Sequence, residues 1–225
     1  MPPFSRRTVV FRVDDCSLDA EGTTIVSDLT FLARNGVYPI VVAPRPSVAR
    51  SYVREMNRSS NVAVGLSGSD AALLPAASDS IGTVQTGILE TLLSAGYVPV
   101  IEPTALGISG NDVDVAADDV ATAIATATEA IRAIFFHGAG GIIETDGATL
   151  IEELTAAEAL TVAERSDLDA DLRAAVRAAA RGVRAGVGAA QIFDGRIAHA
   201  AIVEFLTSRH LGTQVTGGVY MGVPR

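Results

Sequence analysis

Residues 88–101 read ILETLLSAGYVPVI, and this stretch carries the signals of a helix followed by a strand. Its isoleucine and leucine side chains recur at helical spacing up to Leu93, so they form one buried helix face. Gly96 comes directly after, and a glycine just past a helix end supplies the left-handed C-cap. The apolar run 97–101 is typical of a strand that is buried on both faces.

The same order of signals occurs twice more. An amphipathic segment before Gly36 is followed by apolar residues 37–42, and another before Gly186 is followed by residues 189–193. Helices that alternate with apolar strands predict a parallel sheet with helices on both faces, an α/β fold. Further strands are expected at residues 8–11, 61–66, 133–136 and 213–215, and further helices at residues 118–132, after the capping box of Thr155 and Glu158, and at residues 200–208.

No proline-rich or serine-rich linker divides the chain, so we expect a single domain over residues 1–225. Residues 57–60 and 107–112 are predicted to be loops. With 225 residues, 48% of them hydrophobic, the chain can bury a sizeable core.

The chain is acidic overall, and its basic side chains are of a single type. There are 26 acidic and 17 basic residues, for a net charge of −9, and every basic residue is an arginine because the sequence contains no lysine. An acidic chain is a poor partner for nucleic acid, whose binding depends on clustered cations. The apolar runs are too short to span a bilayer, and Cys16 is the single cysteine, so we expect a cytoplasmic protein without a disulfide or a membrane segment.

Several stretches resemble the amino-acid kinase family, and within it the acetylglutamate kinases. They are residues 65–74 (GLSGSDAALL), 92–103 (LLSAGYVPVIEP), 116–118 (AAD), 141–146 (GIIETD) and 193–207 (FDGRIAHAAIVEFLT). The resemblance implies a three-layer αβα sandwich around a mostly parallel eight-stranded sheet. It also implies an acyl amino acid bound by an N-terminal lobe, residues 1–103, and MgATP bound by a C-terminal lobe, residues 104–225.

The family's first strand ends with a catalytic lysine and two glycines whose amides face the phosphates. Here the window reads Arg12-Val13-Asp14-Asp15. Arg12 is the candidate surrogate for the lysine, although a planar guanidinium is not equivalent to an ammonium. A carboxylate about 4 Å from a phosphate costs about 4 kcal/mol at an effective dielectric of 20, so Asp14 and Asp15 repel ATP unless they bind a metal.

The resemblance also assigns the acyl amino acid side of the site. A glycine-rich loop that holds this substrate is replaced by Ala43-Pro44-Arg45-Pro46, in which Arg45 is left as an anion ligand. An asparagine pair that contacts substrate becomes Asp114 and Ala116, and Asp114 could join Asp14 and Asp15 around Mg²⁺. Only residues 47–60 stand where the family carries a further helix and a β-hairpin lid, so the lid is expected to be deleted.

On the nucleotide side, Gly138 falls at the position of the family aspartate that organises the lysines. Thr145 and Asp146 match a nucleotide-contacting stretch, and the second catalytic lysine falls near Ala175. Each lost transition-state donor costs roughly 10²–10³ in rate. We therefore expect a pseudokinase or a repurposed ligand-binding or regulatory protein that associates with itself or with another kinase-family protein.

Other interpretations stay open at this point. One alternative is an active ATP-dependent kinase that forms an acyl phosphate on an N-acylated amino acid with substituted catalytic residues. Arg12 can instead pair with Asp14 or Asp15, and His137 can be a general base or a packing residue. The arginines of residues 173–184 can form a solvated helix face, with Asp169 as the i+4 partner of Arg173.

Overall fold

A computed structural model of the chain describes residues 7–15, 18, 23–77, 80–206 and 211–218. The helices are α1 (Thr23–Arg34), α2 (Pro46–Ser59), α3 (Gly87–Ser94), α4 (Ala117–Ala127), α5 (Ala156–Val162), α6 (Ala170–Arg184) and α7 (Ala200–Leu206), with a short 3₁₀ helix at Asp70–Ala72. The strands are β1 (Thr8–Arg12), β2 (Tyr38–Val42), β3 (Ala63–Leu66), β4 (Ala76–Ala77), β5 (Ser80–Ile81), β6 (Val98–Ile101), β7 (Thr104–Leu106), β8 (Asp112–Asp114), β9 (Arg132–Phe136), β10 (Glu153–Thr155), β11 (Ala189–Phe193) and β12 (Thr213–Thr216).

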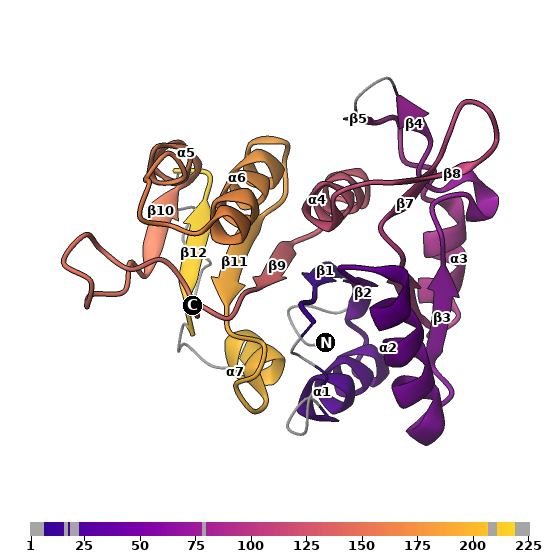
Figure 1. Cartoon of the computed structure of the whole chain (residues 1–225). Helices are drawn as coiled ribbons and strands as arrows, with labels where there is room; N and C mark the ends of the chain where they lie inside the picture. The colour runs from indigo at the N-terminus through magenta and orange to yellow at the C-terminus, as the bar shows by residue number, and fades with distance from the viewer. Residues whose placement is uncertain (1–6, 16–17, 19–22, 78–79, 207–210, 219–225) are drawn as a thin grey trace.

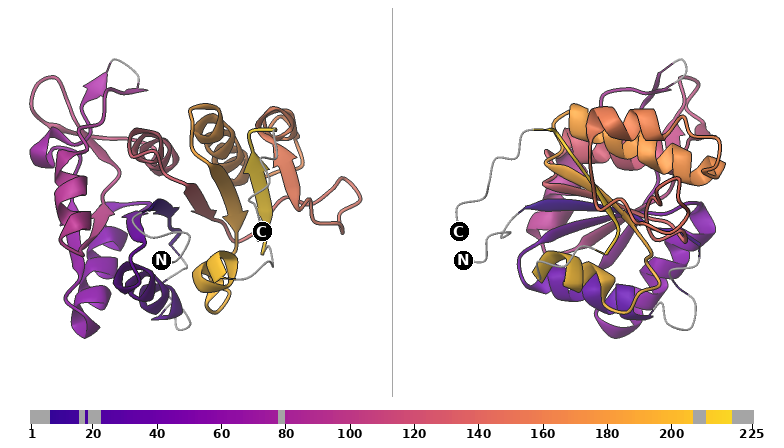
Figure 2. Two further views of the ribbon diagram at one scale, coloured as in Figure 1. Left: turned by 180° about the vertical axis from the view of Figure 1, so that it is seen from behind. Right: turned by 90° about the vertical axis from the view of Figure 1, so that its left-hand side faces the viewer.

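Eight of these strands form one sheet in the order β10-β12-β11-β9-β1-β2-β6-β3. The pairing is parallel except between β11 and β12, which run antiparallel. Two clusters of buried apolar side chains lie on the two faces of the sheet, one under α3, α4, α5 and α6, the other under α1, α2 and α7. Figure 1 and the end-on view in Figure 2 show the three layers, so the expected αβα sandwich is confirmed.

The three glycine C-caps have the predicted backbone. Gly36, Gly96 and Gly186 have φ of 82°, 84° and 110°, in the region that side chains with a Cβ avoid. Thr155 and Glu158 form the predicted capping box at the start of α5. These local signals fix where each helix stops and the next strand begins.

Two expected boundaries are wrong. Residues 57–59, predicted as a loop, belong to α2, which begins with Pro46 in its first turn and buries Val48, Ala49, Tyr52 and Met56. The helix expected over residues 118–132 stops at Ala127, because the chain turns at Glu129 with φ of 48°. The helix expected over residues 200–208 is seen as α7, and positions 207 and 208 lie outside the described residues.

Two small hairpins stand apart from the main sheet. β4 pairs with β5, and β7 pairs with β8 around the predicted loop at residues 107–112. The amide of Leu106 donates to the carbonyl of Leu74 at 2.8 Å, so the β7–β8 hairpin lies against the segment that follows β3. The division of the chain into lobes at residue 103 stays a prediction. None of the described helices is long and apolar enough to cross a membrane.

Candidate functional site

Arg12 and Asp118 form an ion pair at the carboxyl end of β1. Nε of Arg12 lies 2.6 Å from Oδ1 of Asp118, and their side chains are only 19% and 11% exposed. Asp118 lies in the first turn of α4, where the helix N-terminus favours a carboxylate. Burial raises the pKa of Asp118 above its ordinary value of 3.8, while Arg12 lowers it. The guanidinium at the expected lysine position is thus bound by an acid from a distant helix.

Arg45 lies at the next strand end and is also bound to an acid. It immediately precedes α2, and its Nη1 forms an ion pair with Asp15, while its Nε donates to Oγ of Ser47 at 3.2 Å. Both members of the Arg45–Asp15 pair are about half exposed, so water screens their attraction. Arg12 and Arg45 are therefore bound to different carboxylates, Arg12 to Asp118 and Arg45 to Asp15.

Asp114 lies at the end of β8, in the hairpin that projects beside α4. It lines a cavity of about 1,020 Å³ between the two hairpins and the outer sides of α4 and α6. Neither Arg12 nor Arg45 lines this cavity. Among the described residues no group of three acidic, histidine or cysteine side chains is placed to hold a metal ion, so the structure does not bring Asp14, Asp15 and Asp114 together as a set of three ligands. A Mg²⁺ site at Asp14 and Asp15 stays a prediction.

The glycine loop after β9 is closed by an arginine. Nη2 of Arg196 donates to the carbonyl of Gly138 at 3.0 Å and lies 2.7 Å from Oδ2 of Asp194. The hydrogen bond from Arg196 lowers the pKa of Asp194 below its ordinary value. A Cβ added at Gly138 would lie 3.5 Å from Nη2 of Arg196, so this guanidinium covers the loop.

His137 has a partner that its neighbours in sequence do not reveal. Its Nδ1 accepts a hydrogen bond from the amide of Ala139 at 3.1 Å, which leaves the ring N–H of the neutral form on Nε2. Nε2 lies 3.5 Å from Oδ1 of Asp169. Asp169 also caps α6 by accepting from the amide of Leu172 at 2.7 Å. Asp169 therefore links His137 to the start of α6, and the structure gives no pair between Asp169 and Arg173.

Thr145 and Asp146 lie in an exposed loop between β9 and β10. Oδ1 of Asp146 accepts from the amides of Ala148 and Thr149, each at 2.9 Å, and Oδ2 accepts from the hydroxyl of Thr149 at 2.6 Å. These bonds, with the Thr149 hydroxyl first, lower the pKa of Asp146 to about 2. The Asp146 carboxylate therefore stabilises the turn formed by residues 146–149.

A MgATP site needs cations or backbone amides that face the phosphates. The guanidinium groups of Arg12, Arg45 and Arg196 are each bound to a carboxylate of the protein itself. The sequence supplies no lysine to replace them. Each of these three guanidinium groups therefore already has a carboxylate partner within the protein.

Sequence reasoning did not assign a site role to Asp118, Asp169 or Arg196. The sequence around Asp118 and Asp169 does predict the start of a helix. Asp118 lies in the first turn of α4 and Asp169 is the N-cap of α6, both positions where aspartate is favoured. Arg196 follows Asp194 and Gly195 in a turn, which predicts a local pair. The contacts with Arg12, His137 and Gly138 come from segments far apart in sequence.

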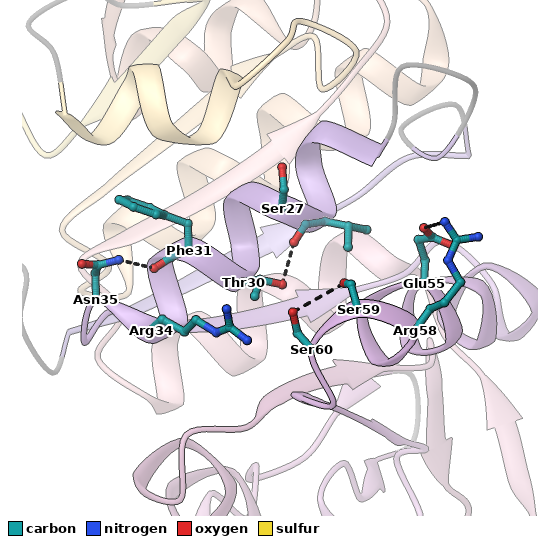
Figure 3. A pocket seen from close by; sticks show the side chains of 10 residues that line it. Ser27, Thr30, Phe31, Arg34, Asn35, Glu55, Arg58, Ser59 and Ser60 are labelled. Carbon is teal, nitrogen blue, oxygen red and sulfur yellow. Dashed lines mark hydrogen bonds and ion pairs between the residues drawn. The ribbon is translucent and has the colours of Figure 1, made fainter.

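A further hollow lies on the opposite helical layer. It has a volume of about 450 Å³ and runs between α1 and α2, lined among others by Phe31, Arg34, Arg58 and Ser60 (Figure 3). Glu55 forms an ion pair with Arg58 at 3.2 Å within α2. None of the site residues expected from the sequence lies in this hollow.

The model of the amino acid kinase family matches residues 47–194, which is more than half of the chain. The chain belongs to this family. It is similar to the acetylglutamate kinase of Prochlorococcus marinus, with 34% identity over 181 residues that cover 76% of this chain and 59% of the relative. For the acetylglutamate kinase of a Nostoc species the identity is 34% over 184 residues, covering 77% and 62%. The chain thus spans about three-fifths of the length of these curated relatives.

Solved structures share the fold. The N-acetylglutamate synthase of Neisseria gonorrhoeae, complexed with coenzyme A and N-acetylglutamate, superposes with a TM-score of 0.81 at 18% identity, over 96% of this chain and 61% of that one. The carbamate kinase of Giardia lamblia bound to AMP-PNP gives a TM-score of 0.67 at 12% identity, over 93% and 98%. Both confirm the amino-acid kinase fold.

Proposed function

We propose that this chain is an acetylglutamate-kinase-like protein that does not transfer phosphate and acts instead as a ligand-binding or regulatory member of its family. The single observation that carries the proposal is the 2.6 Å ion pair between Arg12 and Asp118. Phosphoryl transfer requires cations that are free to neutralise the transferring oxygens. A guanidinium that is mostly buried and neutralised by its own protein does not meet this requirement.

The other arginines at the carboxyl edge of the sheet support the same proposal. Arg45 is bound to Asp15, and Arg196 is bound to both Asp194 and the carbonyl of Gly138. Releasing them would leave carboxylates unpaired beside the phosphates. Each missing donor costs about 10²–10³ in rate, so the combined loss removes most of the acceleration.

The ligand and the partner belong to the proposal as well. The relatives are acetylglutamate kinases, and one structural neighbour is described in complexes with N-acetylglutamate and with L-arginine. An acylated or free amino acid is therefore the ligand class to test first. We further propose that the protein works through association, either with a second copy or with another kinase-family protein.

The deciding experiment combines binding with turnover. The protein is titrated calorimetrically with MgATP and with N-acetylglutamate, and any acyl phosphate is trapped with hydroxylamine as a hydroxamate. An acetylglutamate kinase of known activity is run in parallel as the positive control. We expect no hydroxamate above the enzyme-free reaction.

Two results would contradict the proposal in different ways. Hydroxamate formation that disappears in Arg12→Ala would show an active kinase with a substituted cation. Failure to bind N-acetylglutamate, L-arginine or MgATP, together with a monomeric state in sedimentation and no capture of a kinase-family protein, would remove the ligand-binding and regulatory role.

A further inference from the structure

The cavity of about 1,020 Å³ lies beside the two small hairpins, which Figure 1 shows projecting next to α4. Its volume is at the upper end of the range that is common for small-molecule sites. Much of its lining is apolar, and the apolar side chains include Ala76, Ile81, Ile108, Val113, Val115 and Ala123. Both hairpins and α4 therefore contribute to one apolar surface.

The floor of this cavity is the margin of the hydrophobic core. Ile81, Val113 and Val115 line the cavity and also pack against the buried cluster under α3, α4, α5 and α6. Ile108, in the loop of the β7–β8 hairpin, is by contrast 92% exposed. A ligand whose apolar part covers these four side chains removes apolar surface from water, which favours binding.

Three charged side chains line the cavity in the described part of the chain, namely Asp114, Asp119 and Arg181. Arg181 forms an ion pair with Asp119, so these two charges offset each other. The side chain of Asp114 makes no hydrogen bond or ion pair with any residue in the described ranges. Asp114 therefore leaves one uncompensated negative charge beside the apolar surface.

Other polar groups of the lining are used within the protein. The hydroxyl of Thr122 donates to the carbonyl of Asp118 at 2.8 Å, and Oδ1 of Asn111 accepts from the hydroxyl of Ser109. The start of α4 carries partial positive charge, but Asp118 and Asp119 in its first turn already offset it. The free carboxylate of Asp114 thus sets the sign of the charge that a ligand can bring.

We propose that this cavity binds a small molecule with an apolar body and one ammonium group, and that the ammonium lies against Asp114. The ammonium donates charge-assisted hydrogen bonds to the carboxylate, while the apolar body covers Ile108 and the floor of the cavity. A ligand carboxylate would meet the same charge on Asp114, because Arg181 is held by Asp119. The cavity is not lined by Arg12 or Arg45, so the proposal does not depend on phosphoryl transfer.

The test uses three probes that share one apolar body. They are 3-phenylpropylamine, which is a cation at neutral pH, 3-phenyl-1-propanol, which is neutral, and 3-phenylpropanoate, which is an anion. Each probe is titrated into the full chain at neutral pH while the backbone amides are followed by ¹⁵N NMR. We expect the amine to shift the amides of β8 and α4 and to bind about threefold to tenfold more tightly than the alcohol. The carboxylate should bind more weakly than the alcohol.

The charge is isolated by two variants of the same strand. Asp114→Asn removes the charge and keeps the shape of the side chain, and Asp112→Asn makes the same change outside the lining of the cavity. We expect Asp114→Asn to lower the affinity of the amine to that of the alcohol. Asp112→Asn should leave the preference for the amine in place. Added salt should reduce this preference in the unmodified protein, because the pair with Asp114 is exposed.

The apolar contacts have their own matched variants. Ala123→Phe fills the cavity from α4, whereas Ala127→Phe adds the same ring at the exposed end of this helix, outside the lining. We expect the first to abolish binding of the amine and the alcohol, and the second to leave both unchanged. Ile108→Ser should weaken both probes alike by about threefold, since they share the apolar body. Ile197→Ser, at an isoleucine that is 39% exposed outside the lining, is its control.

Several results would overturn the proposal. Absence of binding by the amine would reject it outright. Equal affinities of the amine and the alcohol, or tighter binding of the carboxylate, would reject the role of Asp114. Shifts that map away from the hairpins, α4 and α6, or binding that survives Ala123→Phe, would reject the cavity. If Ala123→Phe fails to fold, the Asp114 and Asp112 variants, in a hairpin outside the main sheet, still decide the question.

Discussion

Oδ1 of Asp28 lies 2.8 Å from Nδ1 of His199, so a carboxylate of α1 is bound to the residue that precedes α7, 171 positions further along the chain. The side chain of Asp28 is 1% exposed, whereas that of His199 is 58% exposed. The backbone of Ala201 and of Ile202, in the first turn of α7, also lowers the pKa of Asp28. One buried acid therefore holds the start of α7 against α1 on the same face of the sheet.

This contact makes a prediction about titration. Burial raises the pKa of Asp28 above its ordinary value of 3.8, and the bond from His199 is the largest influence that lowers it. His199→Ala should therefore raise the pKa of Asp28 further, as read from the ¹³C shift of its carboxyl group against pH. The contribution of Asp28 to stability is full below pH 3.8 and declines as the pH rises through its folded pKa. A midpoint at or below 3.8 in the unmodified protein would contradict this account.

The pair of Arg12 and Asp118 predicts an unequal effect of two neighbouring substitutions. Asp118→Asn leaves a mostly buried guanidinium without its counter-charge and should lower the free energy of unfolding by about 2 kcal/mol. Asp119→Asn removes the partner of Arg181 from a pair that is about half exposed, and should cost at most about 0.5 kcal/mol. Urea unfolding of the two variants measures the difference. Equal losses would mean that the Arg12 pair is as weak as a surface pair.

We predict that the carboxyl group of Asp146 titrates in the same way with and without a ligand. Thr149→Val removes the hydroxyl that donates to Oδ2 of Asp146, so the pKa of Asp146 should rise from about 2 toward 3.8. In the unmodified protein the local stabilisation is present above pH 3.8 and is lost as the pH falls through about 2. Carboxyl NMR shifts give both values. Because this carboxylate is committed to its own turn, added MgATP should leave the titration unchanged, and a large shift would restore the nucleotide-contact hypothesis.

Asn57 predicts a link between stability and self-association. Asn57→Ala removes both hydrogen bonds to Ala63 and should cost about 1–2 kcal/mol in urea unfolding. It also leaves the outer side of β3 open for pairing with other chains, so the variant should form larger species at high concentration in light scattering. Ser59→Ala, two residues along the same helix, is the control. An Asn57 variant that stays monodisperse would show that the edge is protected by other means.

Much of the fold could be predicted because its signals are local. Gly36, Gly96 and Gly186 each end a helix in a positive-φ conformation that glycine adopts more readily than any residue with a Cβ. The helix α2 was missed because Pro44 and Pro46 suggest an interruption, although proline is also favoured in the first turn of a helix. The end of α4 could not be placed, since Glu129 takes a positive φ without a glycine to announce it.

The candidate site was less predictable for a physical reason. The sequence identifies Arg12 and Arg45 as cations at strand ends, but their partners depend on where α4 and the loop after β1 lie in space. Asp118 and His137 are likewise bound to residues that the fold alone brings near. The absence of lysine, by contrast, follows from the sequence directly and needs no spatial information.

The central position of β1 has a consequence for the order in which the molecule can form during synthesis. Its partner on one side, β2, follows within a few tens of residues, but its partner on the other side, β9, pairs Arg12 with Phe135, more than a hundred residues later. At about 5–20 residues per second, roughly 5 to 19 s pass between the synthesis of Val42 in β2 and that of Phe135 in β9. During that interval one side of the future centre of the sheet stands exposed, and the nascent chain needs protection there before its last strands emerge.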